Sequence, residues 1–176
     1  LISLHFNSTQ IQTLSLKNTT INILKSINFN KLINLKSLDL SDNSLSSDFI
    51  NSFPIQNLNK LQNIHLRNCS IDNKILELLS KKKVKEIDLS NNINLFDSIS
   101  NNFGLFNNNS LKIIILNNLN IFSLDKFLFA NNDNLISLSL KYNKLNQILS
   151  TDFGIYNFLL NFLDLSYNMI EYIEYD

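Results

Sequence analysis

Apolar residues recur along the chain in one arrangement, L-x-x-L-x-L-x-x-N-x-L, which is complete in LKSLDLSDNSL at residues 35–45. A repeat of this kind with a period of 20–29 residues predicts stacked turns that each contribute one short strand. Because side chains alternate along a strand, the second apolar position and the residue two further on point into a common core. We call the second apolar position the anchor; it returns every 23–27 residues, at Leu14, Leu38, Ile64, Ile87, Ile114, Leu138 and Leu163.

A polar position follows five residues after each anchor, and we call it the ladder position. Asparagine there can bond to backbone groups of neighbouring turns that would otherwise be buried and unpaired. Leu119 breaks this pattern, so at that turn we expect another partner or water to satisfy the backbone, and poorer regularity. Cys69 is interpreted as a buried structural thiol. The ladder residues are Thr19, Asn43, Cys69, Asn92, Leu119, Asn143 and Asn168.

Large apolar residues also recur fifteen positions after the anchor, where they are predicted to fill the convex half of the core. They are Phe29, Phe53, Leu79, Phe129 and Phe153, with Phe103 displaced by one position. Residues Ile75, Leu76, Leu78 and Leu79 have helical spacing and predict a short convex helix. The lysines at 81–83 that follow are interpreted as its solvated end, in preference to a nucleic-acid or membrane patch.

The pattern predicts a leucine-rich solenoid domain over residues 11–176, with about seven repeats and the last one truncated at Asp176. Residues 1–10 fit the strand template but lie too close to Leu14, so we interpret them as the remnant of an N-terminal cap. The net charge is +0 and no basic face accumulates, which disfavours nucleic acid as a partner. No apolar run reaches the roughly 18 residues of a membrane span, so no direct membrane insertion within this chain is expected.

Residues that flank the inward positions project to solvent, and equivalent residues of successive strands form columns about 4.8 Å apart. One predicted cluster is charged and the other is apolar and aromatic, a composition typical of protein-binding hot spots. The alternative is an ordinary solenoid surface without a ligand. The charged cluster contains Asp39, Asp42, His65, Arg67, Glu86 and Asp88, and the other contains Ile113, Ile115, Tyr142, Phe162 and Tyr167, with Asp164 as a further candidate.

Catalytic and metal chemistry find little support in the sequence. Asp39, His65 and Asp88 resemble a metal or acid/base set, but they occupy equivalent positions on an open sheet without an enclosing pocket. Gly104 and Gly154 alone cannot form a glycine-rich phosphate loop. We therefore predict no catalytic residues, no metal and no cofactor. Four N-x-S/T sequons permit N-glycosylation, at Asn7, Asn18, Asn68 and Asn108.

With this many matches to the motif, residues 11–176 resemble the leucine-rich repeat family. The segments INILKSINFNKLINLKSLDLSDNSL and LDLSYNMIEYIEYD look like the 24-residue typical repeats of animal extracellular proteins such as Toll-like receptors and chaoptin. The chain departs from them in lacking cap cysteines and the usual proline near the first repeat. The resemblance implies an α/β fold: a right-handed horseshoe with a parallel β-sheet on its concave face and loops and short helices on its convex face.

We therefore expect a non-enzymatic module that binds a protein ligand or co-receptor on its concave face. Its expected setting is the extracellular or cell-surface ectodomain of a receptor or adhesion protein. The alternative is a cytoplasmic scaffold or regulatory arm that targets a larger signalling protein. The sequence makes no prediction about the oligomeric state.

Overall fold

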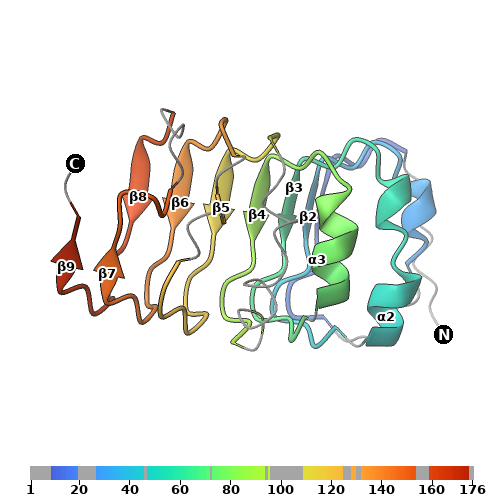
Figure 1. Ribbon diagram of the computed structural model, residues 1–176. Helices are drawn as coiled ribbons and strands as arrows, with labels where there is room; N and C mark the ends of the chain where they lie inside the picture. Colours follow the sequence, from blue (N-terminus) through green and yellow to red (C-terminus); the bar gives the residue numbers. More distant parts are fainter. Residues whose placement is uncertain are drawn as a thin grey trace.

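A parallel sheet of seven strands runs along the solenoid in chain order (Figure 1). The computed structural model describes residues 9–19, 27–45, 47–71, 73–93, 95, 109–124, 128–129, 132–153 and 159–174. Each strand pairs in register with the next, so that Leu38 lies between Leu14 and Ile64. The predicted leucine-rich solenoid with a parallel sheet is confirmed. Its strands are β1 (Thr13–Ser15), β2 (Ser37–Asp39), β3 (Asn63–His65), β4 (Glu86–Asp88), β5 (Ile113–Ile115), β6 (Ser137–Ser139) and β8 (Phe162–Asp164).

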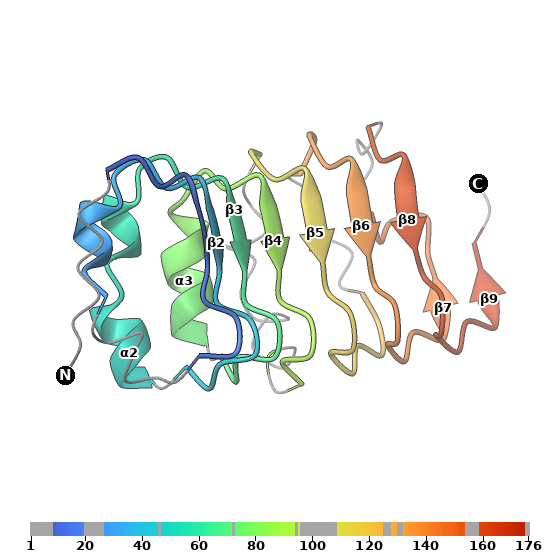
Figure 2. The ribbon, with the colours of Figure 1, turned by 180° about the vertical axis from the view of Figure 1, so that it is seen from behind.

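Short helices cover the side of the solenoid opposite the sheet in the N-terminal half of the chain (Figures 1 and 2). They are η1 (Phe29–Lys31), α2 (Ser47–Ser52), η2 (Ile55–Asn57) and α3 (Asn73–Ser80). Helix α3 is the predicted convex helix, and it buries Ile75 and Leu79 almost completely. Near the C-terminus, β7 (Gln147–Ile148) pairs with β9 (Tyr172–Ile173) in a second, two-stranded parallel sheet.

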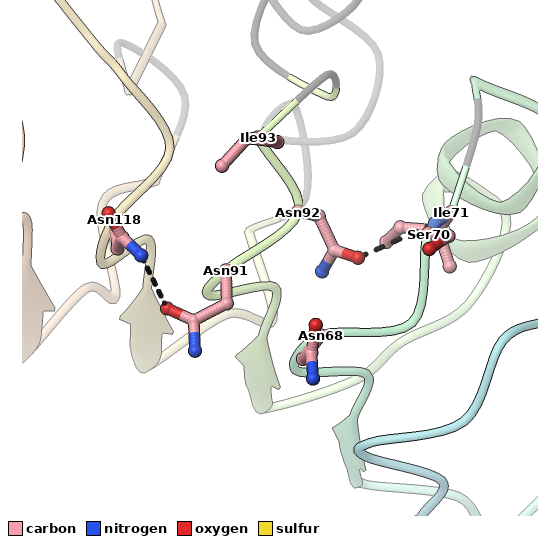
Figure 3. A pocket seen from close by; sticks show the side chains of 7 residues that line it. All are labelled: Asn68, Ser70, Ile71, Asn91, Asn92, Ile93 and Asn118. Carbon is pink, nitrogen blue, oxygen red and sulfur yellow. Dashed lines mark hydrogen bonds between the residues drawn. The ribbon is translucent and has the colours of Figure 1, made fainter.

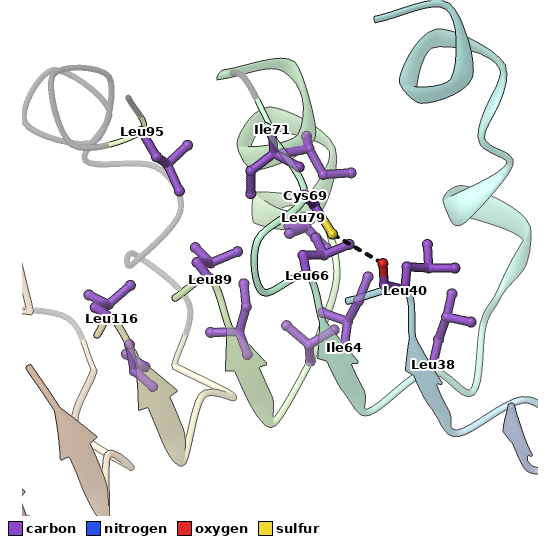
Figure 4. Close-up of a cluster of buried hydrophobic side chains, with 14 of the residues drawn as sticks. Leu38, Leu40, Ile64, Leu66, Cys69, Ile71, Leu79, Leu89, Leu95 and Leu116 are labelled. Carbon is purple, nitrogen blue, oxygen red and sulfur yellow. Dashed lines mark hydrogen bonds between the residues drawn. The ribbon is translucent and has the colours of Figure 1, made fainter. Parts of the chain in front are cut away.

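The core lies between the sheet and the convex side, as the alternation of apolar positions predicts (Figure 4). The anchors of the middle strands, such as Ile64 and Ile87, have no exposed surface. On the convex side, the rings of Phe29 and Phe53 meet edge to face with centroids 5.1 Å apart. Phe129 is also fully buried, whereas Phe103 lies outside the described residues. The predicted layer of convex aromatic residues is confirmed at these three positions.

Asparagines at four of the seven ladder positions connect the backbones of neighbouring turns. The N–H of Thr19 donates to Asn43 Oδ1 at 2.8 Å. Asn43 Nδ2 donates to the carbonyl groups of Leu16 at 2.9 Å and Leu40 at 2.7 Å. A single buried side chain thus satisfies backbone groups of its own turn and of the turn before it. The same pattern recurs at Asn92, Asn143 and Asn168.

The two ladder positions that depart most from the pattern keep the backbone paired. The N–H of Leu119 donates to Asn143 Oδ1 at 2.9 Å, so the other partner expected there is the asparagine of the next turn. The strands β4, β5 and β6 keep their register across Leu119, and the sheet continues without interruption. Cys69 Sγ donates to the Leu40 carbonyl at 3.1 Å, and burial raises the pKa of its thiol to about 11. Cys69 is therefore a structural thiol.

Replacing a ladder asparagine should destabilise the solenoid. Asn143→Ala removes the acceptor of the Leu119 N–H and the donor to the Leu116 carbonyl. Each buried group left unpaired costs about 1–3 kcal/mol. We expect a clear fall in the urea midpoint. The exposed Asn59→Ala is the matched control and should change stability by less than about 0.5 kcal/mol. Equal midpoints for the two variants would contradict the role of the ladder.

A second prediction concerns Asp152, a buried carboxylate that accepts the N–H of Leu149 at 2.7 Å. Burial raises its pKa above the ordinary 3.8, and the nearby Glu174 adds to the shift. Because the pKa of Asp152 is raised in the folded state, protonated Asp152 adds to the free energy of unfolding at a pH below its pKa in the unfolded chain. This contribution is lost as the pH rises through its pKa in the folded state. Asp152→Asn keeps an acceptor without the charge, so it should raise the melting temperature at neutral pH but not near pH 3. A lower melting temperature at neutral pH would refute this.

Candidate functional site

One column of residues, four positions after each anchor, adopts the left-handed backbone conformation in every turn that the structure describes. We call it the rim column, because each member follows the end of a strand. Asparagine and aspartate tolerate this conformation, whereas it is uncommon for bulky residues. The first five turns use these tolerant residues, and the last two carry tyrosine. The rim column consists of Asn18, Asp42, Asn68, Asn91, Asn118, Tyr142 and Tyr167, with φ between 52° and 61°.

Tyr142 and Tyr167, which we call the tyrosine pair, form an exposed aromatic stack. Their ring centroids lie 4.3 Å apart with an interplanar angle of 17°. Lys141 Nζ lies 5.5 Å from one centroid and 5.2 Å from the other. Stacking and cation–π attraction each contribute about 0.5–1.5 kcal/mol, which holds the rings in place. The residues nevertheless remain 51% and 66% exposed. The pair is thus an ordered aromatic surface that faces solvent.

Two adjoining hollows run along the rim column and end at Tyr142. They share Asn91 and Asn118 in their linings, and we call the two hollows together the rim groove. Figure 3 shows the first hollow, where side chains from three successive turns converge. The first hollow is lined by Asn68, Ser70, Ile71, Asn91, Asn92, Ile93 and Asn118, and the second by Arg67, Asn91, Asn117, Asn118, Lys141 and Tyr142.

Hydrogen bonds between turns fix several amide side chains of the rim groove. Asn118 Nδ2 donates to Asn91 Oδ1 at 3.1 Å (Figure 3). Asn117 Oδ1 accepts from Ser139 Oγ at 2.7 Å and from the N–H of Lys141 at 2.8 Å. The polar lining is therefore preorganised.

The neighbouring polar residues of the rim are also held by interactions between turns. Asn68 Nδ2 donates to Asp42 Oδ1 at 3.1 Å, and this bond together with Lys17 lowers the pKa of Asp42. A 180° rotation of the Asn91 side-chain amide lets its oxygen accept from Arg67 Nε at 3.1 Å and Nη2 at 3.3 Å. Arg67 therefore lies within hydrogen-bond reach of the groove's amide lining.

The predicted acidic residues of the sheet column have a local structural role. Asp39 and Asp88 each accept, through Oδ1, the N–H of the serine two residues later at 2.9 Å. Asp164 accepts the N–H of Ser166 at 3.0 Å, and the bonds from Ser166 lower the pKa of Asp164. The recurrent D-L-S sequence carries this signal, which lies outside the apolar repeat pattern. One oxygen of each carboxylate is thus engaged in the turn.

The charged cluster does not converge on a metal site. His65 lies in register between Asp39 and Asp88, but its Nε2 contacts Glu86 Oε1 at 3.0 Å, and both side chains are partly buried. Lys17 Nζ lies 3.4 Å from Asp42 Oδ2. Within the ranges that the structure describes, no three His, Cys, Asp or Glu side chains are grouped so that they could hold a metal ion.

The apolar cluster is divided by strand β6. Ile113 and Ile115 lie half-buried on β5, and Phe162 lies on β8 with 54% of its surface exposed. Ser137 on β6 stands in register between Ile113 and Phe162, and Ser139 on β6 is the register partner of Ile115. Tyr142 and Tyr167 contact each other, whereas the serines of β6 separate the isoleucines of β5 from Phe162 on β8.

Two of the predicted sequons fall on the rim column. Asn18 and Asn68 are exposed, and Asn68 donates to Asp42 as described. Asn7 and Asn108 lie outside the described residues.

No protein-family model matches the sequence, and no curated protein matches it. Among solved structures, the chain is similar to the crystal structure of a TLR13-ssRNA13 complex, with a TM-score of 0.60 and 23% sequence identity. The match covers 92% of this chain and 25% of that chain, so this chain spans about a quarter of its length. The likeness shows the fold, a leucine-rich solenoid like that of a Toll-like receptor. Across the described ranges, no helix combines the length and the apolar character needed to cross a membrane.

The role of Asp88 in its turn can be separated from its charge. Asp88→Asn keeps an oxygen that accepts the N–H of Ser90, so we expect stability close to that of the unchanged protein. Asp88→Ala removes the acceptor and should cost about 0.5–1.5 kcal/mol. Urea unfolding of the two variants measures the difference. If Asn proved as destabilising as Ala, the charge and not the turn bond would be the important contribution.

Proposed function

We propose that the chain is a non-enzymatic protein-binding module that uses its sheet face and rim, with the tyrosine pair as the main binding contact. The observation that carries this proposal is the placement of Tyr142 and Tyr167. They are exposed and stacked in a backbone conformation that the five earlier turns give to asparagine or aspartate. Unusual backbone conformations of this kind concentrate at functional sites, and tyrosine is enriched among the residues that dominate binding energy.

The rest of the surface fits this role. Phe162 and Ile115 supply apolar area on either side of β6, and the strands that carry them are already formed, so little ordering accompanies binding. Arg67, Asp39 and Asp88 would orient the partner through their charges. The remaining predicted contacts are His65, Ile113 and Asp164.

A protein ligand fits the charges better than a nucleic acid does. The similar solved structure is a complex of TLR13 with ssRNA13. Binding to a phosphate backbone rests mainly on clustered Lys and Arg side chains. The solvent-facing columns one position before and one, three and four positions after the anchors instead carry five carboxylates against three basic side chains, Lys17, Arg67 and Lys141. The carboxylates belong to Asp39, Asp42, Glu86, Asp88 and Asp164.

The proposed setting is the ectodomain of a cell-surface receptor or adhesion protein. Support comes from the repeats that look like those of extracellular proteins and from the likeness to a Toll-like receptor fold. The exposed sequons at Asn18 and Asn68 are compatible with secretion. The competing proposal, a cytoplasmic scaffold, predicts no glycan on either residue when the natural protein is isolated and treated with a glycosidase.

Capture of binding proteins by the immobilised chain tests the proposed site. Tyr142→Ala combined with Tyr167→Ala should lower capture at least about tenfold, because hot-spot residues cost about 2 kcal/mol or more when truncated. Quantitative mass spectrometry of the captured proteins gives the measurement.

The control variant is Lys81→Ala, which alters an exposed cation on the convex side. Lys82 is unsuitable, because its Nζ donates to the Gln56 carbonyl at 2.9 Å. If the tyrosine variant and the control captured the same proteins equally, the tyrosine pair would not be the main binding contact.

A further inference from the structure

We propose that the rim groove binds an extended acidic segment of the protein partner, with two carboxylate side chains four residues apart held by Arg67 and Lys141. The inference rests on the proposed function in one respect, namely that the partner is a protein. It adds where on the rim a segment of the partner lies and which sequence pattern it carries.

Charge favours an anionic ligand in this groove. The second hollow of the rim groove is lined by two cations, three asparagines and a tyrosine, and by no acidic residue. Within the part of the chain that the structure describes, neither Arg67 nor Lys141 has a carboxylate within ion-pair distance. Lys141 lies over the rings of the tyrosine pair, and Arg67 is exposed. In this range neither cation is neutralised by an ion pair, and the one side-chain partner within reach of Arg67 that is described above is the neutral amide of Asn91. A guanidinium suits a carboxylate especially well.

The spacing of the two cations favours an extended peptide. Arg67 and Lys141 each stand three positions after an anchor, on the turns of β3 and β6, so three strand spacings separate them. At about 4.8 Å for each spacing, the Cα atoms of Arg67 and Lys141 are about 14 Å apart. An extended peptide advances at most about 3.3–3.6 Å per residue, so four residues cover about 13–14 Å. Residues four apart in an extended chain also point to the same side.

The asparagines between the two cations suit the backbone of such a segment. Asn118 contacts Asn91 through its Nδ2 and keeps its Oδ1 as an acceptor. An amide side chain with a donor and an acceptor matches the N–H and C=O of an extended peptide. The ring of Tyr142 closes one end of the groove and offers a surface for an apolar side chain. Backbone recognition would thus supply contact area, while the two cations select the spacing of the carboxylates.

Fluorescence anisotropy with a synthetic probe tests the inference on the chain as it is. The probe is a labelled peptide of about eight Ser, Thr and Val residues with two glutamates four positions apart. We expect saturable binding that weakens about tenfold or more with Arg67→Glu or Lys141→Glu, because a charged hydrogen bond is lost and repulsion replaces it. Lys17→Glu is the matched control, since Lys17 holds the equivalent position in its turn, pairs with Asp42 and lies outside the groove. This variant should bind as the unchanged chain does.

Two further arms make the result decisive. The double variant Arg67→Glu with Lys141→Glu should bind a probe in which both glutamates are replaced by lysine. A probe with glutamates three positions apart should bind more weakly, because its side chains point to opposite sides.

Absence of binding at millimolar probe would overturn the inference, as would binding that the charge reversals leave unchanged. Binding of a sulfated polysaccharide in place of the peptide, with the same dependence on Arg67 and Lys141, would also overturn it. These outcomes leave the tyrosine test of the proposed function intact.

Discussion

Hydrogen bonds from four ladder asparagines, Asn43, Asn92, Asn143 and Asn168, to the backbone of the adjacent turn help to hold the solenoid in register. Each three-residue strand pairs with its neighbours, and backbone bonds between turns continue past it to the rim column, as from the Asp42 N–H to the Arg67 carbonyl at 2.8 Å. The buried amide of Asn43 or Asn143 completes the pairing at the point where the strand ends. The rim column lies directly before each ladder residue, so the positions of the rim side chains depend on the same bonds. The ladder bonds therefore help to fix the backbone of the candidate site.

Much of the fold could be predicted from the sequence, because its causes are periodic. The anchors recur at nearly constant spacing, and stacking places equivalent residues side by side, as Leu38 lies between Leu14 and Ile64. The convex layer of Phe29 and Phe53 follows from a second constant offset. Even the exception at Leu119 is harmless, since each asparagine serves the turn before it. Periodic positions alone thus settle the path of the backbone.

The site is less predictable, because it depends on which neighbour each side chain contacts. His65 contacts Glu86 and neither of the aspartates beside it in the column, and two serines on β6 divide the predicted apolar patch. The aspartates bind the serine N–H groups of their own turns, a consequence of side-chain rotamers that column position does not reveal. The sequence predicts that the tyrosine pair is exposed, but its stacking and its left-handed backbone appear only in three dimensions.

Hydrogen exchange of the ladder amides tests the dependence on the asparagine bonds most directly. The N–H groups of Cys69 and Leu119 lie outside the strands, yet each donates to the asparagine of the next turn. We predict that they exchange as slowly as the strand amides of β3 and β5, and far faster once Asn92 or Asn143 is replaced by alanine. Fast exchange of both amides in the unchanged chain, at the rate of exposed turn residues, would contradict the central role of the ladder.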